Sequence, residues 1–514
     1  MAEHTKTPHI IIVGAGPGGL TAGMLLAHRG ARVTLLEQKS RVGGRNAELT
    51  LGDYRFDIGP TFLMMRFLLE QIFEETGRNA SEYMEIVDLD PMYELRFKDG
   101  SIFPSSNTEK MRAEVARTFP GEEEGFDAFL KREAKRFHYM YPCLQKDYSS
   151  PTALLSKPFL RSIPHLGIGK SLYQVLSNYF SSENLKLSFT FQSKYLGMSP
   201  WTCPGAFAMI PYVEYGYGIH HVMGGLSKIS EGMAKVVIEE GGDIQLNTKV
   251  DRIVTRNGKA CGVTLEDGRT LEADDVIINA DFAHAMSNLF EPGYLKKYPE
   301  EKLKHREYSC STFMLYLGLD KVYDIPHHLI VFAEDYRKNL TDISQRKVLS
   351  DEFSFYVRNA SVNDPSLAPE GHSALYVLVP VPNNQSGIDW EAQRETMREQ
   401  VLQALETRGG LTDLRKHIRA EEVISPDQWE SDYNVFLGAT FNLAHTLEQM
   451  LYFRPHNRFE EAKNCYLVGG GTHPGSGLPT IYESGRITSN LISDKYRLRY
   501  KLPPTVPPKR GNIL

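Results

Sequence analysis

The apolar and polar positions at the start of the chain predict a strand, a helix and a second strand in close succession. Residues 10–13 are apolar without interruption, which is typical of a strand buried in a parallel sheet. Apolar positions then recur at helical spacing between Leu20 and His28. A second strand is expected over residues 32–36, which Glu37 follows. This succession predicts a βαβ unit.

Three glycines, Gly14, Gly16 and Gly19, separate the first strand from the helix. In a dinucleotide site the first glycine permits a tight turn, the second lets a pyrophosphate approach the backbone, and the third lets the helix pack on the strand. The helix N-terminus offers free N–H groups and a positive dipole end to phosphate. Glu37 stands where an acid accepts the ribose hydroxyls. We interpret the unit as a dinucleotide site; the alternative is a glycine-rich turn in an unrelated α/β protein.

The far end of the chain repeats this order. Residues 464–468 predict a buried strand, residues 469–479 a glycine-rich turn, and a helix is expected from about Thr480 to Lys495. Strand signals between residues 241 and 279 end in Asn279-Ala280, which indicates an earlier return to the same domain. Both ends of the chain are therefore expected in one dinucleotide-binding domain.

The intervening segments predict a mixed helical and antiparallel domain. Asp99-Gly100 supplies a hairpin turn, and long apolar runs in the second half alternate with polar turns. The expected elements are a helix over Phe62–Thr76, a hairpin near Tyr93–Phe103, helices over 108–147, strands at Thr312–Leu319 and Ala374–Val381, and a helix at about Trp390–Arg408.

Two stretches stand out by charge. Residues 148–182 contain no Asp or Glu, and Lys157, Arg161 and Lys170 interleave there with apolar residues. Such a basic, apolar, helix-compatible segment fits a membrane interface; the alternative is a helix pair that packs on the protein body. In residues 195–227 only Glu214 carries a formal charge, so this stretch is either ordinary core or the wall of a cavity for an apolar ligand.

Overall composition excludes several classes of function. The charged fraction is 24% and the formal net charge is −6, and we find no basic patch interleaved with aromatics, so no nucleic-acid partner is predicted. Five cysteines lack any C-x-x-C pair, which indicates a reducing compartment without a disulfide framework or zinc site. The adjacent pairs His220-His221 and His327-His328 point to opposite faces of a strand, so we predict no metal site.

The sequence also bears on location. No secretory signal is visible, because the first strand begins by residue 9, and no run of about 18 apolar residues predicts a spanning helix. The tail over 501–514 is basic and proline-rich, and we expect it to be extended and mobile. We expect a cytoplasmic protein attached peripherally to the inner face of the membrane through residues 148–182.

Five anchors together resemble the flavin-dependent amine oxidase superfamily, and more closely its bacterial-type phytoene desaturase branch, which includes the dehydrosqualene (diapophytoene) desaturases. The anchors are Val13–Gly19, Gly43–Arg45, Asp57–Thr61, Gly224-Gly225 with Val250, and Gly471–Pro479. The last is the most specific, because general amine oxidases do not usually show Thr-His-Pro-Gly there, whereas carotenoid desaturases do. The resemblance covers nearly the whole chain.

The resemblance implies FAD bound in an extended pose. The first glycine turn would hold the pyrophosphate, Glu37 the adenosine ribose, and the Val250 backbone the adenine, while Gly471 and residues 478–480 would lie beside the ribityl chain and the isoalloxazine ring. The implied cofactor-binding residues are Gly14, Ala15, Gly16, Pro17, Gly18, Gly19, Glu37, Gln38, Gly44, Arg45, Gly59, Pro60, Thr61, Val250, Gly470, Gly471, Leu478, Pro479 and Thr480.

The implied fold class is α/β with an α+β substrate part. A discontinuous, Rossmann-like FAD-binding domain would comprise residues 1–90, 220–295 and 445–500. The inserted substrate domain, with an antiparallel sheet and the membrane-associating helical segment, would comprise residues 91–219 and 296–444.

The implied reaction is desaturation of a linear polyisoprenoid of the phytoene or dehydrosqualene type. The flavin takes a hydride while a base or water takes the neighbouring proton, and a quinone or oxygen is the expected electron acceptor. His473 and Glu483 are the candidate proton acceptors by the resemblance. The alternatives are that His473 only fixes its turn and that Glu483 only bonds to the backbone.

Three other functions remain open at this point. The first is another flavin reaction on a carotenoid: isomerisation, saturation, or oxidation of a terminal methyl group. The second is an amine oxidase that acts on a soluble substrate. The third is a flavin-free relative that binds prenylated proteins, against which the complete set of glycines at both chain ends argues.

Overall fold

A five-stranded parallel sheet joins segments from three distant parts of the chain. The computed structural model describes residues 7–502 and 504–508. Its strand order is β10-β2-β1-β14-β20, and every neighbouring pair is parallel. The strands are β1 (His9–Val13), β2 (Arg32–Leu36), β10 (Asp243–Gln245), β14 (Asp275–Ile278) and β20 (Cys465–Leu467). The predicted return of the chain to its first sheet is therefore confirmed.

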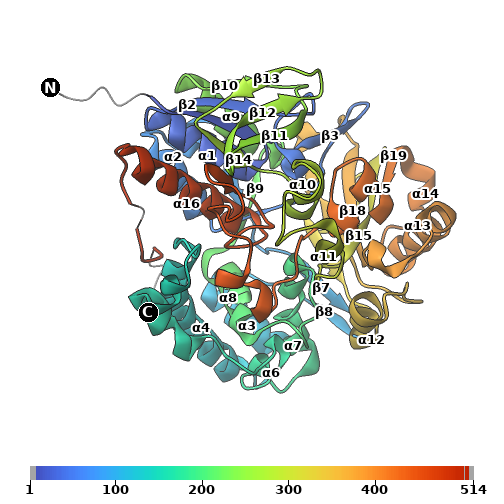
Figure 1. Ribbon diagram of the computed structural model, residues 1–514. Coiled ribbons are helices and arrows are strands. Elements are labelled where there is room, and N and C mark those ends of the chain that lie inside the picture. The colour runs from blue at the N-terminus through green and yellow to red at the C-terminus, as the bar shows by residue number, and fades with distance from the viewer. Residues whose placement is uncertain (1–6, 503, 509–514) are drawn as a thin grey trace.

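Three helices cover one face of this sheet: α1 (Pro17–His28), α9 (Ser227–Glu239) and α16 (Leu478–Tyr496), of which α1 packs against both others (Figure 1). The sequence predicted that α1 begins near Leu20 and α16 near Thr480; in the structure both helices begin slightly earlier, at Pro17 and Leu478. Helices α1 and α16 each have a proline in the first turn, where the missing N–H costs nothing because no intrahelical acceptor exists for it. The small antiparallel sheet of β11 (Val250–Arg256), β12 (Lys259–Leu265) and β13 (Thr270–Glu272) lies beside β14.

A seven-stranded sheet forms the second half of the molecule, in the order β19-β15-β18-β17-β16-β7-β8. The strands are β7 (Glu94–Phe97), β8 (Gly100–Ile102), β15 (Ser311–Leu319), β16 (His328–Val331), β17 (Phe355–Asn359), β18 (Ser373–Val381) and β19 (Ile418–Ile424). All pairs are antiparallel except β16 with β7. The hairpin expected near 93–103 and the strands expected at Thr312–Leu319 and Ala374–Val381 are confirmed, and the latter two are antiparallel neighbours.

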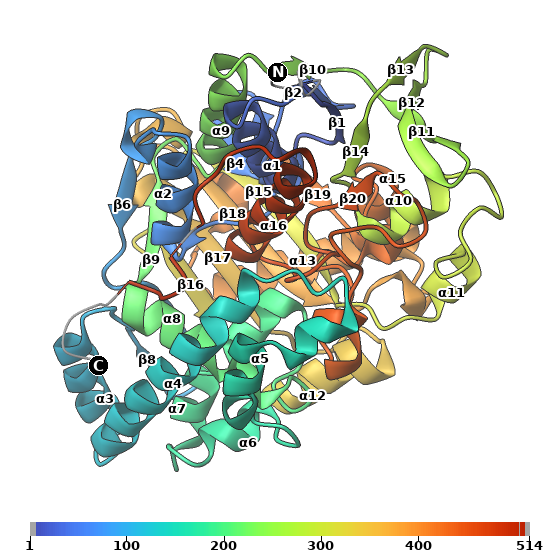
Figure 2. The ribbon, with the colours of Figure 1, turned by 60° about the vertical axis from the view of Figure 1, so that its left-hand side comes forward.

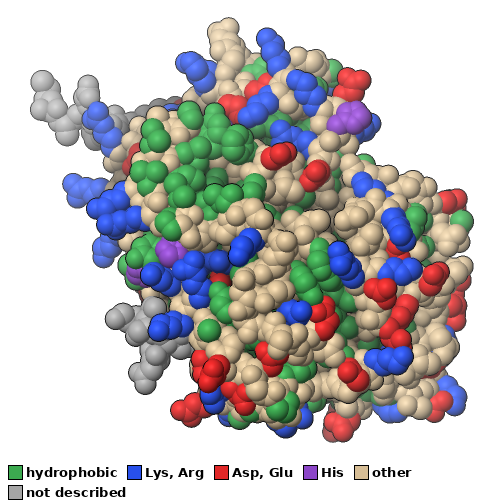
Figure 3. Space-filling view, turned by 90° about the horizontal axis from the view of Figure 1, so that it is seen from below, with side chains coloured by type: hydrophobic (Ala, Val, Ile, Leu, Met, Phe, Trp, Pro, Cys, Tyr) green, Lys and Arg blue, Asp and Glu red, His purple; other side chains and the backbone are tan. Residues whose placement is uncertain are grey.

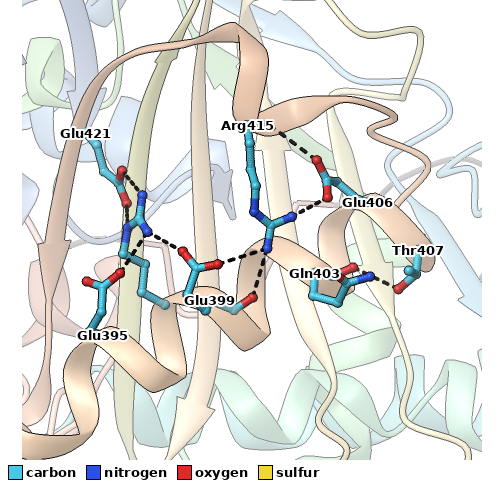
Figure 4. A network of polar contacts seen from close by, with 8 residues as sticks. Glu395, Glu399, Gln403, Glu406, Thr407, Arg415 and Glu421 are labelled. Atoms are coloured by element: carbon cyan, nitrogen blue, oxygen red, sulfur yellow. Dashed lines mark hydrogen bonds and ion pairs between the residues drawn. The ribbon is translucent and has the colours of Figure 1, made fainter.

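Helix α13 (Trp390–Thr407) covers one face of this sheet, and ion pairs tie it to the edge strand. Arg398 on α13 forms a bidentate pair with Glu421 on β19, at 2.6 and 2.7 Å (Figure 4). Arg415, on the short helix α14 (Leu414–His417), pairs with Glu399 at 3.2 Å and with Glu406. The Arg398 pair thus ties α13 to edge strand β19, and the Arg415 pairs tie α13 to α14.

Helices between the two sheets and below them complete the fold (Figures 1 and 2). They are α2 (Arg66–Glu75), α3 (Thr108–Thr118), α4 (Glu123–Leu144), α5 (Lys157–Ser162), α6 (Leu172–Leu176), α7 (Glu183–Ser188), α8 (Met209–Tyr217), α10 (Phe282–Asn288), α11 (Glu300–Lys304), α12 (Tyr336–Thr341) and α15 (Pro426–Ser431). Short strands β3 (Glu48–Leu51), β4 (Tyr54–Asp57), β5 (Leu63–Met64), β6 (Ile86–Asp88) and β9 (Ile219–Val222) form two small sheets. The mixed α/β fold class is confirmed, whereas the exact domain boundaries stay a prediction.

The helix expected over Phe62–Thr76 begins only at Arg66, because β5 precedes it and Met65 adopts φ 49°. Residues 148–182, expected to be compatible with helix, fold into short helical turns, of which α5 and α6 are the α-helical ones. Among the helices of the described residues, none is long and apolar enough to cross a membrane.

The described part of the C-terminal tail touches the protein. The Gln145 side chain donates a hydrogen bond to the carbonyl of Pro504 at 3.1 Å, and the Tyr217 hydroxyl donates to that of Pro508 at 3.0 Å. The predicted mobility of this tail also concerns residues 503 and 509–514, which lie outside the described residues.

Candidate flavin and substrate cavity

One large cavity, of about 1050 Å³, begins at the carboxyl ends of β1 and β2 and reaches the second sheet. Carboxyl ends of parallel strands are where α/β sheets bind ligands. Of the predicted cofactor-binding residues, fifteen line it: Gly14, Gly16, Pro17, Gly18, Glu37, Gln38, Gly44, Arg45, Gly59, Pro60, Thr61, Val250, Gly470, Leu478 and Pro479. The structure thus brings together residues that are more than 450 positions apart in the chain.

The first glycine turn has no room for side chains. A Cβ at Gly14 would lie 2.3 Å from the carbonyl oxygen of Asn279, and one at Gly19 would lie 2.3 Å from that of Gly14. Gly14 also has φ +99°, which disfavours other residues. Backbone N–H groups at the start of α1 consequently face the cavity without side chains in the way, which fits the pyrophosphate of FAD.

Glu37 is fixed at the end of β2. Its Oε2 accepts a hydrogen bond from the Ala15 N–H at 2.8 Å, and its Oε1 accepts one from the Lys39 N–H at 2.9 Å. The side chain is buried yet lines the cavity, so a carboxylate edge faces the place where the resemblance puts the ribose. The structure fits that role.

Arg45 lies on the other side of the same cavity. Its Nη1 donates to the Thr440 carbonyl at 2.6 Å. Burial lowers the pKa of this guanidinium, and nearby Asp281 partly opposes that shift. A Cβ at Gly59 would lie 2.7 Å from the Arg45 carbonyl oxygen, so residues 59–61 pass directly over this segment. A half-buried cation at this point suits the phosphates of a dinucleotide.

The remaining predicted site residues do not line the cavity. Ala15 contributes through its N–H to Glu37, and a Cβ at Gly471 would meet Phe282. Gly19 and Thr480 lie in helix α1 and helix α16 respectively. These four residues stand behind the residues that line the cavity and support them.

His473 and Glu483, the candidate proton acceptors, also lie away from the cavity lining. The His473 ring stands edge-on to Tyr148 at 4.8 Å, and burial lowers its pKa to about 3. Glu483 accepts a 2.6 Å bond from Arg486, which also pairs with Glu75; burial raises the pKa of Glu483 and Arg486 opposes the shift. Their contacts are with other protein groups, so the geometry does not support a catalytic role for either.

Sequence reasoning missed Asn279. Its side chain donates from Nδ2 to the carbonyl of Gly14 at 2.9 Å and to that of Gly16 at 3.3 Å, which holds the glycine turn in place. Its position in the sequence could have indicated this role, because Asn279 directly follows the buried strand β14, which pairs with β1. Residues at the carboxyl end of such a strand meet the turn that follows its neighbour.

Asp57, the first residue of the anchor Asp57–Thr61, is held by a buried ion pair and a backbone hydrogen bond. Its Oδ2 pairs with Arg358 on β17 at 2.8 Å, and its Oδ1 accepts from the Leu226 N–H at 2.7 Å. Burial raises the pKa of this carboxyl, and Arg358 opposes the shift. Asp57 thus joins the two halves of the molecule directly before the cavity-lining residues 58–61.

The part of the cavity beyond residue 61 is apolar and aromatic. Its walls combine the second sheet with residues from both neighbouring segments: Phe62, Tyr93, Phe191, Tyr195, Met314, Ile330, Phe355, Tyr356, Tyr376 and Leu378. From the predicted wall segment 195–227 only Tyr195 lines the cavity, and the others are ordinary core. A flat polar ligand at one end and a long apolar one at the other would both fit.

Histidines near this part have protein partners. His328 lines the cavity and its Nδ1 lies 2.7 Å from the Tyr356 hydroxyl, which in turn lies 2.7 Å from that of Thr61. The neighbouring His221 and His327 bond to Asp364 and Asn363. In the described chain, no group of three His, Cys, Asp or Glu side chains could hold a metal ion.

Comparison with known proteins agrees with this geometry. The model of flavin-containing amine oxidoreductases matches residues 17–493. The chain belongs to that family. Its cofactor is therefore FAD, and the protein is an FAD-dependent oxidoreductase.

Curated relatives of this oxidoreductase carry carotenoid-related names. A 4,4'-diapophytoene desaturase (4,4'-diapolycopene-forming) from Methylomonas sp. is 56% identical, with 96% of this chain and 97% of that protein covered. An all-trans-zeta-carotene desaturase from Myxococcus xanthus is 38% identical, with 96% and 94% covered. A 4,4'-diapolycopen-4-al dehydrogenase from Metabacillus indicus is 34% identical, with 94% and 97% covered.

Solved structures share the fold at low sequence identity. Cyclohexylamine oxidase from Brevibacterium oxydans matches with a TM-score of 0.60 and 16% identity, covering 96% of this chain and all of that one. An oxidoreductase from Methanosarcina mazei matches with a TM-score of 0.61 and 18% identity, covering 93% and 99%. These likenesses support the mixed α/β fold of the flavin amine oxidase superfamily.

Proposed function

We propose that this flavoprotein is a carotenoid desaturase that removes a hydride and a proton from a linear polyisoprenoid of the phytoene or dehydrosqualene type. The observation that carries the proposal is the single cavity, whose glycine-lined end suits FAD and whose other end is aromatic and apolar. The 56% identity to a diapophytoene desaturase favours the dehydrosqualene skeleton.

Bound FAD would supply the hydride acceptor for this chemistry. The contribution of the chain is to align the substrate and to exclude water. Residues 58–62 connect the two ends of the cavity, so the same short segment faces both the cofactor and the substrate. The Thr61–Tyr356–His328 contacts hold this segment against the second sheet.

The apolar walls match the energetics of such a substrate. Removing one CH₂ group from water contributes roughly 0.8 kcal/mol, so a skeleton of about thirty carbons gains on the order of 20 kcal/mol. A molecule of this kind resides in the bilayer, and the enzyme must receive it there. An amine substrate would not need so large an aromatic chamber.

Attachment to a membrane surface follows as part of the proposal. Exposed apolar side chains of residues 155–168, beside Lys157 and Arg161, are candidates for the contact. The turn that contains Phe453 packs beside residues 151–155 and adds to the same patch. Figure 3 shows hydrophobic side chains gathered on this lower face, with Lys and Arg side chains beside them. We place the protein at the cytoplasmic face of the membrane.

The test is product analysis with purified, FAD-loaded protein and liposomes. Diapophytoene and phytoene are supplied separately, each with either a quinone or oxygen as electron acceptor. New conjugated double bonds without added oxygen are expected, with diapophytoene preferred. Shifted, lost or oxygenated double bonds would instead identify an isomerase, a saturase or a terminal oxidase. Flavin reduction by a soluble amine would indicate an amine oxidase.

A further inference from the structure

Lys194 is a basic residue in the apolar and aromatic part of the cavity. It belongs to the 3-10 turn Phe191–Leu196 and lines the cavity next to Tyr195. Among the described residues, no carboxylate lies within ion-pair distance of its Nζ. Two aromatic rings lie close to it: the Tyr336 ring centroid is 4.8 Å from Nζ and that of Phe332 is 6.0 Å away.

Burial without a carboxylate partner changes the protonation of this amine. Desolvation lowers the pKa of Lys194 to about 7. Two other titratable groups that face it, Cys310 and Tyr336, keep their protons, because burial raises the pKa of Cys310 to about 12 and raises that of Tyr336 further. Near neutral pH a large fraction of Lys194 is thus a free amine, which is a nucleophile.

The turn holds this amine in place. Gln192 donates to Glu214 at 2.8 Å, and the flanking side chains of Phe191, Ser193 and Leu196 are buried. The side chain of Lys194 retains partial accessibility because it faces the cavity. The backbone that carries this amine is therefore fixed in the protein, and the amine is open to whatever enters the cavity.

We propose that Lys194 forms a reversible imine with a polyisoprenoid that carries a terminal aldehyde. The amine nitrogen adds to the carbonyl carbon, C=N replaces C=O, and the oxygen leaves as water, so no oxidant or reductant is consumed. The imine is neutral, which suits an enclosed apolar site better than an unpaired ammonium does. This inference rests on the proposed function only for the isoprenoid class of the ligand.

The polar groups around Lys194 favour a ligand that ends in an aldehyde over a ligand that ends in a carboxylate. A carboxylate needs several donors, but the nearby hydroxyls of Tyr93 and Tyr195 already bond to Glu214. Lys194 would be left as the single donor for a full negative charge. An aldehyde requires only the amine itself.

The test uses the FAD-loaded full chain, the linear isoprenoid aldehyde farnesal in phosphatidylcholine vesicles, and sodium cyanoborohydride. An imine at Lys194 is then reduced to a stable amine that intact mass and peptide mapping detect. At pH 7 an ordinary lysine is neutral roughly a thousandfold less often than Lys194, so the terminal α-amine, with an ordinary pKa of about 8, is the competing site for brief labelling, and peptide mapping separates the two. We expect an adduct at Lys194 whose rate rises with pH with a midpoint near 7 and, unlike that of the terminal amine, falls when squalene fills the cavity.

Variants complete the design. Lys194→Met and Lys194→Arg remove the nucleophile and should lose the adduct, whereas Lys186→Arg, eight positions away and paired with Glu183, should keep it. The wild-type pH profile carries the test if a Lys194 variant fails to fold. An unlabelled Lys194, or labelling that squalene does not reduce, would overturn the proposal.

Flavin reduction by diapophytoene, measured in parallel on the wild-type protein, separates the two claims. An adduct without flavin reduction contradicts the desaturase function alone. Flavin reduction without an adduct contradicts the imine alone.

Discussion

Replacing Leu155 and Ile168 by aspartate should release the protein from membranes. Both side chains are exposed, at 73% and 67% of their surface, and both lie in the acid-free segment 148–182. Full burial of such a side chain contributes about 1.5–3 kcal/mol. At the observed exposure, insertion of each into the interface would contribute about 1–2 kcal/mol.

The double variant should therefore lose about 2–4 kcal/mol of membrane affinity, which is a decrease of about 30- to 1000-fold in the partition coefficient. The two added negative charges act in the same direction on anionic lipid. Lys157, Arg161 and Lys170 each contribute about 1 kcal/mol near an anionic surface, so wild-type binding should also weaken with salt.

Co-sedimentation with liposomes of one part anionic to three parts neutral lipid measures the effect. The matched control is Ile238→Asp with Leu246→Asp, because these side chains are also exposed, at 61% and 38%, but lie on α9 and directly after β10 at the opposite end of the molecule (Figure 1). Equal sedimentation of both double variants and the wild type would refute the assignment of this patch.

Three further predictions concern the interior. Gly19→Ala places a Cβ 2.3 Å from a backbone oxygen and should abolish FAD retention, measured as flavin absorbance per protein after gel filtration. Gly216→Ala, whose Cβ would lie 3.5 Å from the nearest atom, of Tyr212, should retain the flavin. Arg358→Met leaves the Asp57 carboxylate buried and unpaired, and should cost about 3–5 kcal/mol of stability in denaturant unfolding, which the double variant with Asp57→Leu should largely recover. Burial raises the pKa of Glu214 to about 7 from an ordinary value of 4.5, so the folded state binds the proton more tightly and loses stability as the pH rises through 7. Glu214→Gln should accordingly raise the free energy of unfolding by up to about 3 kcal/mol at pH 8 but leave it unchanged at pH 4. An equal change at both pH values would contradict this.

The sequence predicted the nucleotide end of the cavity well because that end depends on local signals. Gly14, Gly16 and Glu37 occupy fixed positions relative to β1 and β2, so the strand pattern alone places them. The second glycine-rich turn, after β20, carries the same kind of signal. The two glycine-rich turns can be predicted to lie close together because the carboxyl ends of parallel strands meet at the same edge of a sheet.

The substrate end could not be predicted in the same way. Its walls come from strands β15 to β18 and from single residues such as Phe62 and Tyr93, and which face of each strand points to the cavity is set by tertiary packing. The apolar stretch 195–227 is mostly core because composition does not distinguish a buried wall from a buried centre. Lys194 lies one residue before that stretch, and only its three-dimensional surroundings mark it.

His473 and Glu483 illustrate a related limit. His473 stands in the most specific motif of the chain and Glu483 lies just after it in α16, yet neither lines the cavity, and they contact Tyr148 and Arg486 respectively. A motif fixes the path of the backbone, whereas the direction of each side chain follows from what packs around it.

The central claim is that one flavin accepts the hydrogens of one new double bond in this cavity. Anaerobic mixing of the FAD-loaded protein with liposomal diapophytoene tests this claim most directly. The visible absorbance of the flavin follows its bleaching, and the product is quantified after one turnover. The account predicts one reduced flavin for each carbon–carbon double bond formed. Bleaching without a new double bond, or a new double bond while the flavin stays oxidised, would contradict it.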